Sequence, residues 1–247
     1  MKTLNLLTRS IALGALLMSP SMVRAGIVGS PHDFSAEAWN VKPSDQNSVC
    51  GTCHTPHHAD STVVPLWAHT TTSTTFIMYD NANVPVANLQ ATVDSQPAGP
   101  SKACLSCHDG TVAVNQYGGA VQGGTPITIT NSARIVGADS SLTHTHPISL
   151  TYDNNIAGIG AGKDKFLFNP DTRQVLQPDS GTFITGNDMT VNGFLLNGNH
   201  RLECTSCHDV HNQEGTPFNI SLNPKLVKIV GTQAGKGSLL CRSCHDK

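Results

Sequence analysis

Cys50-Gly51-Thr52-Cys53-His54 is a motif in which two cysteines stand three positions apart and a histidine directly follows the second one. The same Cys-x-x-Cys-His pattern returns at Cys104 to His108, at Cys204 to His208 and at Cys241 to His245. Together the four motifs use all eight cysteines of the 247-residue chain. The fold therefore has to form around whatever this motif binds.

The motif is typical of covalent c-type haem attachment. Two thiols at this spacing form thioether bonds with the two vinyl groups of one porphyrin edge, while the histidine binds the iron. Zinc sites, redox dithiols and disulfide frameworks also use Cys-x-x-Cys, but none of them requires the histidine. With 12 histidines in 247 residues, chance would place one after all four motifs with a probability on the order of 10⁻⁵. We therefore predict four haems c, attached through Cys50, Cys53, Cys104, Cys107, Cys204, Cys207, Cys241 and Cys244, with His54, His108, His208 and His245 as proximal iron ligands.

Each iron also needs a ligand on its other face. Beyond residue 25 the chain has two methionines, Met78 and Met189, so methionine cannot serve all four irons. The remaining histidines are His32, His57, His58, His69, His144, His146, His200 and His211. Eight imidazoles for four positions favour bis-His coordination, which gives a lower reduction potential than His/Met coordination.

Two of these histidines follow a motif histidine at a fixed distance. His57 stands three residues after His54, and His211 stands three residues after His208. Neither side chain can bend back to the far face of the same iron, so we expect each to ligate a neighbouring haem. The second and fourth motifs lack this extra histidine, which indicates a duplicated two-haem unit.

The N-terminal residues predict export. Residues 1–25 combine the basic Lys2 and Arg9, an apolar run from Ile11 to Met18 and a small-residue end at Val23-Arg24-Ala25, as in a signal peptide. The apolar run of about 8 residues is much shorter than the roughly 20 that a spanning helix needs. We expect a secreted protein, extracellular or on the outer surface, with the periplasm as the alternative, that does not span a membrane.

Charge restricts the partners. Residues 1–25 hold three of the 15 Lys and Arg residues and none of the 17 Asp and Glu residues, so the rest of the chain has a net charge of −5. Nucleic acids are bound by clustered basic residues, which makes them poor partners for this chain. Basic protein surfaces and metallic surfaces are electrostatically easier.

The composition indicates a thin side-chain core. Aromatic residues make up 5% of the chain, against 22 glycines and 14 prolines, so the haems must supply much of the apolar interior. We predict a multihaem cytochrome c fold, mostly irregular coil with short helical turns and a few β-hairpins wrapped around four haems. The expected division is a single tetrahaem domain over residues 26–247, with a haem pair in 26–115, a β-rich insert in 116–198 and a second haem pair in 199–247. Within it, runs 127–130, 148–152 and 181–185 have strand character, and 199–210 favours a helical turn.

The chain also resembles the tetrahaem cytochromes of the OmcE type, extracellular proteins of metal-reducing bacteria that polymerise into filaments. The matching segments are Gly29 to Asp33, Cys53 to His57, Pro65 to His69, Cys104 to Thr111, His146 to Ser149 and Cys207 to Asn212. Ala68 and Val210 depart from the family pattern. The resemblance implies bis-His ligation with His57, His69, His146 and His211 as distal ligands and His32 as a fifth claimant. We hypothesise that His32, on an N-terminal arm, ligates a haem of another copy.

These observations favour an electron conduit over an enzyme. Tunnelling falls steeply with distance, and four attachment sites in a small chain place haems close together. The implied partners are further copies of the chain, redox donor and acceptor proteins, and extracellular metal oxides. The alternatives are a multihaem oxidoreductase, which needs one iron with an open face, a soluble periplasmic shuttle, and a structural fibre.

Overall fold

The computed structural model describes residues 26–35, 37, 49–60, 63–80, 90–158, 164–176, 189–211, 226–229, 231–233 and 236–246. The expected signal peptide and the run 181–185 lie outside the described residues. The elements are α1 (Gly99–His108), β1 (Gln116–Tyr117), β2 (Ala120–Val121), the 3₁₀-helix η1 (Ser132–Arg134), β3 (Leu150–Thr151), the π-helix η3 (Val191–Leu195), β4 (Arg201–Leu202), α2 (Cys204–Cys207), β5 (Thr232–Gln233), β6 (Gly237–Ser238) and α3 (Leu239–Cys244).

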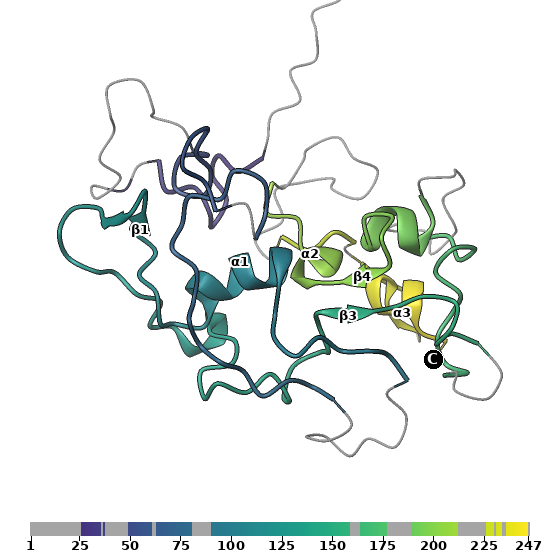
Figure 1. Ribbon diagram of the computed structural model, residues 1–247. Helices are drawn as coiled ribbons and strands as arrows, with labels where there is room; N and C mark the ends of the chain where they lie inside the picture. The colour runs from purple at the N-terminus through teal and green to yellow at the C-terminus, as the bar shows by residue number, and fades with distance from the viewer. Residues whose placement is uncertain are drawn as a thin grey trace, which may run out of the picture.

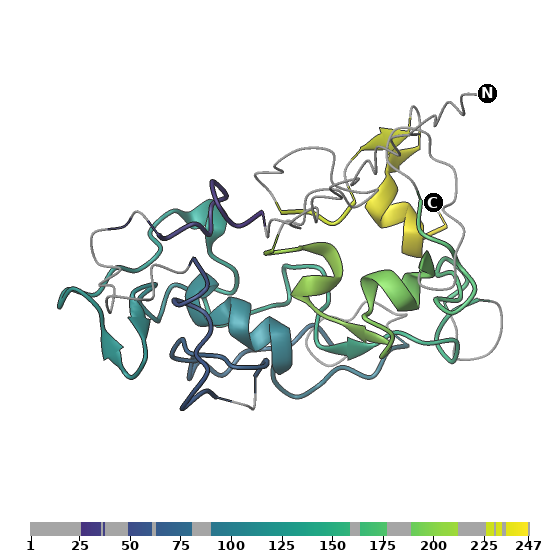
Figure 2. The ribbon, with the colours of Figure 1, turned by 90° about the horizontal axis from the view of Figure 1, so that it is seen from above.

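Helices occur where the cysteine motifs lie. The second motif ends α1, the third forms α2 and the fourth closes α3, whereas the first is built from turns. In Figures 1 and 2 the three helices follow one another across the molecule, from α1 through α2 to α3. Among the described residues, no helix has the length and apolar character needed to cross a lipid bilayer.

The strands form three antiparallel two-stranded ladders of two residues each within the described part of the chain. The run 148–152 contains β3, whose partner is the distant β4: Leu150 faces Leu202 and Thr151 faces Arg201. The run 127–130 belongs to no strand, contrary to expectation. The buried Asn115 explains this difference, because its side-chain oxygen takes the Ile127 N–H at 3.0 Å in place of a strand partner.

Two apolar clusters replace a single large core. The smaller cluster packs Leu105 of α1 against Phe76, Met78 and Leu142, each less than 5% exposed. The larger cluster joins β3, η3 and α3 and consists of Leu150, Tyr152, Ala157, Val175, Leu176, Val191, Leu195, Leu196, Ile229 and Leu239. Val93 packs against both clusters, so the two halves of the molecule are continuous.

Gly137 is required by the smaller cluster. Its φ is +69°, and a Cβ there would lie 3.0 Å from Phe76 and 3.1 Å from Leu142. Gly118 has a similar φ of +61°, but a Cβ there would meet nothing within 4 Å.

We therefore expect Gly137→Ala to lower the free energy of unfolding by about 2 kcal/mol or more, since backbone strain and overpacking combine. Gly118→Ala is the control for backbone strain alone and should cost about 1 kcal/mol. Denaturant titration of both variants measures the difference. Equal losses would contradict the packing around Gly137.

Candidate haem-attachment sites

Each motif helix presents its reactive residues in the arrangement that haem attachment needs. Residues three apart on a helix share a face, so Cys104 and Cys107 of α1, like Cys241 and Cys244 of α3, lie side by side. The eight cysteines are free thiols. Burial is the main cause that raises the pKa of the second cysteine of every motif, to about 11 for Cys53 and Cys207 and about 12 for Cys107 and Cys244. These sulfurs thus face surroundings of low polarity.

The residue before the second cysteine is a structural anchor that the sequence analysis missed. In the last three motifs it is a serine, and Ser106, Ser206 and Ser243 are each 2% exposed or less. Each hydroxyl accepts a backbone N–H: Ser106 from Thr72, Ser206 from Glu203 and Ser243 from Leu176, at 3.0 to 3.3 Å. The recurrence of serine at this position was the available signal.

Three motif histidines lie opposite a second histidine. The ring centroids of His54 and His211 are 6.3 Å apart, with ring planes at 23°. Those of His108 and His32 are 6.0 Å apart, and those of His245 and His146 are 6.2 Å apart. His32, His146 and His211 are three of the five predicted claimants for the distal positions.

These separations fit one metal ion between each pair of rings. Metal–nitrogen bonds of about 2.0 Å place the centroids of two imidazoles on opposite sides of one ion about 6.3 Å apart. Ordinary ring packing also spans roughly 4.5 to 7 Å, so distance alone does not identify such a site. The composition of the pairs is the stronger argument, because each joins one motif histidine to one non-motif histidine.

Backbone carbonyls orient the rings. Nδ1 of His54 lies 3.1 Å from the Pro65 oxygen, and Nδ1 of His108 lies 2.7 Å from the Arg134 oxygen. Nδ1 of His146 lies 2.9 Å from the Pro147 oxygen. An Nδ1–H donated to a carbonyl fixes the tautomer in which Nε2 carries the free lone pair, the usual arrangement of a metal-binding histidine.

His32 lies within its own chain's site. The described residues 26–35 form turns in place of the expected extended arm, with the Asp33 carboxylate accepting the Gly29 N–H at 2.7 Å. Burial, followed by the nearby His108, lowers the pKa of His32 to about 4, so its ring is neutral at physiological pH. Within the chain, the motif histidine next to the His32 ring is His108, and the hypothesis that His32 serves another copy stays a prediction.

For His208, the histidine of the third motif, we compare the two further predicted claimants, His57 and His69. His69 is 3% exposed, and its two ring nitrogens lie 2.8 Å from the Thr70 oxygen and 3.0 Å from the Ala113 oxygen. Its Nε2 also lies 3.4 Å from the Cys107 sulfur, so the buried ring packs against the second motif, whereas His57 is exposed.

Of the remaining histidines, His200 is engaged elsewhere, with Nε2 at 2.7 Å from Asp171, and His58 and His144 are exposed.

The thiols of successive motifs are neighbours. The interaction between the Cys104 and Cys204 side chains raises the pKa of Cys104 well above its usual value and lowers that of Cys204. After burial, the next cause that raises the pKa of Cys107 is Cys53, and Cys241 contributes to the raised pKa of Cys207. The thiols of each motif thus influence the pKa of a thiol in the next motif, from the first to the fourth.

Several buried polar atoms at these sites have no hydrogen-bond partner. They include Nδ1 of His32, the hydroxyls of Thr52 and Thr205, and Nε1 of Trp67. Thr52 and Thr205 lie inside motifs, and the Trp67 ring stands 6.2 Å from that of His54. Buried groups without partners are uncommon in complete structures. Their position beside the motifs is one at which a haem would contact them.

Within the described ranges, no group of three or more His, Cys, Asp or Glu side chains is arranged to hold a metal ion. A porphyrin supplies four of the six ligands of its iron, so two imidazoles per haem are all that the chain has to add. No protein-family model matches the chain, and no curated protein matches it.

Proposed function

We propose that this chain is a tetrahaem c-type cytochrome that transfers electrons. The observation that carries the proposal is the pairing of His54 with His211, His108 with His32 and His245 with His146, at 6.0 to 6.3 Å between ring centroids. When bound, each haem supplies an iron that accepts and releases one electron. The protein's part is to hold the haems in order and to keep their irons closed to other ligands.

The pairing supports closed irons. An enzyme that reduces a small substrate at haem needs an iron with an open face, whereas an imidazole on each side of the iron excludes exogenous ligands. Three pairs come from the geometry above. For the iron bound by His208 we propose His57 as the second ligand. His57 beside the first motif would then ligate the third haem, just as His211 beside the third motif would ligate the first haem.

The neighbouring thiols support a continuous route. Because Cys53 lies near Cys107, Cys104 near Cys204 and Cys207 near Cys241, the haem edges attached to successive motifs would lie close together. Electrons would pass along the chain of motifs in sequence order.

Secretion and assembly into an extracellular filament complete the proposal. Both rest on the sequence: the signal-like segment 1–25 and the resemblance to filament-forming tetrahaem cytochromes. Negative-stain electron microscopy of the secreted protein tests the assembly, since a monodisperse monomer would contradict it.

The haem content and ligation are tested together. Mass spectrometry of the whole chain should find four covalently bound haems, and the ferrous protein should not bind carbon monoxide. His211→Ala should open one iron of the four, so carbon monoxide should then bind at one haem per chain. His144→Ala, which replaces an exposed histidine without a proposed role, is the matched control and should bind none. Carbon monoxide binding by the unsubstituted protein would refute closed ligation.

The assignment of the fourth distal ligand has its own test. We expect His57→Ala to produce a high-spin ferric signal from one haem, because the iron at His208 loses its second imidazole. His69→Asn should leave all four irons low-spin, although removal of this buried ring should lower the melting temperature. Electron paramagnetic resonance distinguishes the two, and a high-spin signal in His69→Asn alone would reverse the assignment.

A further inference from the structure

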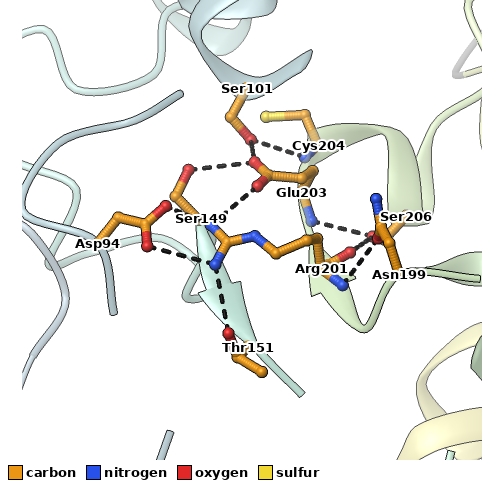
Figure 3. A network of polar contacts seen from close by, with 9 residues as sticks. All are labelled: Asp94, Ser101, Ser149, Thr151, Asn199, Arg201, Glu203, Cys204 and Ser206. Carbon is orange, nitrogen blue, oxygen red and sulfur yellow. Dashed lines mark hydrogen bonds and ion pairs between the residues drawn. The ribbon is translucent and has the colours of Figure 1, made fainter. Parts of the chain in front are cut away.

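A buried carboxylate lies directly before the third motif, where α1 meets α2. Glu203 is 7% exposed. Its side chain accepts hydrogen bonds from the Ser101 hydroxyl of α1, from the Ser149 hydroxyl at 3.1 Å and from the Arg201 guanidinium at 3.3 Å (Figure 3). The Ser101 oxygen in turn accepts the Cys204 N–H at 3.1 Å. Glu203 thereby joins the helix of the second motif to the helix of the third.

The network around Glu203 carries a net negative charge. Arg201 reaches both carboxylate oxygens of Asp94 with its two terminal nitrogens, and it reaches Glu203 with one. Two carboxylates thus share one guanidinium. The side chain of Glu203 is 8% exposed, against 28% for Arg201 and 35% for Asp94. Solvent therefore screens the Glu203 charge least.

This charge lies beside two attachment sulfurs. Cys204 follows Glu203 in the sequence, and its backbone N–H donates to the Ser101 hydroxyl that also binds Glu203, on the helix that carries Cys104. In the haem-loaded chain these sulfurs would be the thioether ends of two adjacent macrocycles. A fixed negative charge in a poorly screened position disfavours the addition of an electron nearby.

We propose that Glu203 lowers the reduction potential at the junction of the second and third haems, and that Arg201 limits this effect by sharing its charge. The inference rests on the proposed function, because it requires the haems to be present. It adds to that function where in the series of four haems the reduction potential is lowered. Ser101 and Ser149 keep the carboxylate in place by donating to it.

The test uses substitutions that remove charges of opposite sign. Glu203→Gln removes the negative charge at nearly constant size, so the midpoint potential of one or two of the four haems should rise. Arg201→Gln removes the positive charge, so the same potentials should fall, whereas Arg201→Lys keeps the charge and should leave them unchanged. Spectroelectrochemical titration of the full haem-loaded chain measures these shifts. A merely structural role for the network gives no reversal of sign.

Asp139→Asn is the matched control, because Asp139 is an exposed carboxylate whose side chain caps a turn at Ser141. It should shift no potential. Unchanged potentials in Glu203→Gln, or shifts of one sign in both Gln variants, would overturn the inference. If Glu203→Gln does not load haem, the comparison of Arg201→Gln with Arg201→Lys decides: a lower potential in Arg201→Gln alone supports the inference, and equal potentials refute it.

The same experiments separate this inference from the proposed function. An unsubstituted chain with fewer than four haems by mass spectrometry contradicts the proposed function itself. If four haems are present but their midpoint potentials do not change when the charge of Glu203 or Arg201 is removed, only the inference is contradicted.

Discussion

A single short turn has to carry two cysteines on one face and a histidine directly after them, and the rest of the chain is arranged around this constraint. In the last three motifs the turn is helical and holds a buried serine: Ser106 and Ser243 each accept a backbone N–H from another segment, and Ser206 accepts the N–H of Glu203 at the start of its own helix. Regular structure elsewhere is brief, since each segment has only to reach the next motif and cover it.

The chain compensates for a thin core with polar connections between distant segments. The β3–β4 ladder brings Arg201 next to Thr151. Glu203 accepts hydrogen bonds from a hydroxyl of α1 and from a hydroxyl of the loop before β3. Buried polar groups are costly unless their partners are all present. Such a network therefore specifies one relative placement of the motif helices, which a loosely packed apolar contact would not do.

The sequence predicted the local chemistry better than the spatial arrangement. The spacing of His57 and His211 from their motifs indicated service to a neighbouring site, and the structure places His211 beside His54 of a motif far away in the sequence. Periodicity could not predict which motif that would be, because the pairing depends on long-range contacts. It also misjudged 127–130, where the side chain of Asn115 competes with a strand partner. The role of Ser106 and its counterparts was readable in principle from their recurrence, but serine is too common in loops to stand out in one motif.

The placement of His211 beside His54 has a consequence for how the molecule matures. A secreted chain crosses the membrane from its N-terminus, so the first motif reaches the haem-attachment machinery long before His211 does. On the proposed ligation, His211 would become available to the first site only after most of the chain has been exported. On that proposal, completion of the first site would require the third motif to have folded, so the exchange of histidines between motifs would make the order in which the chain emerges a control on its assembly.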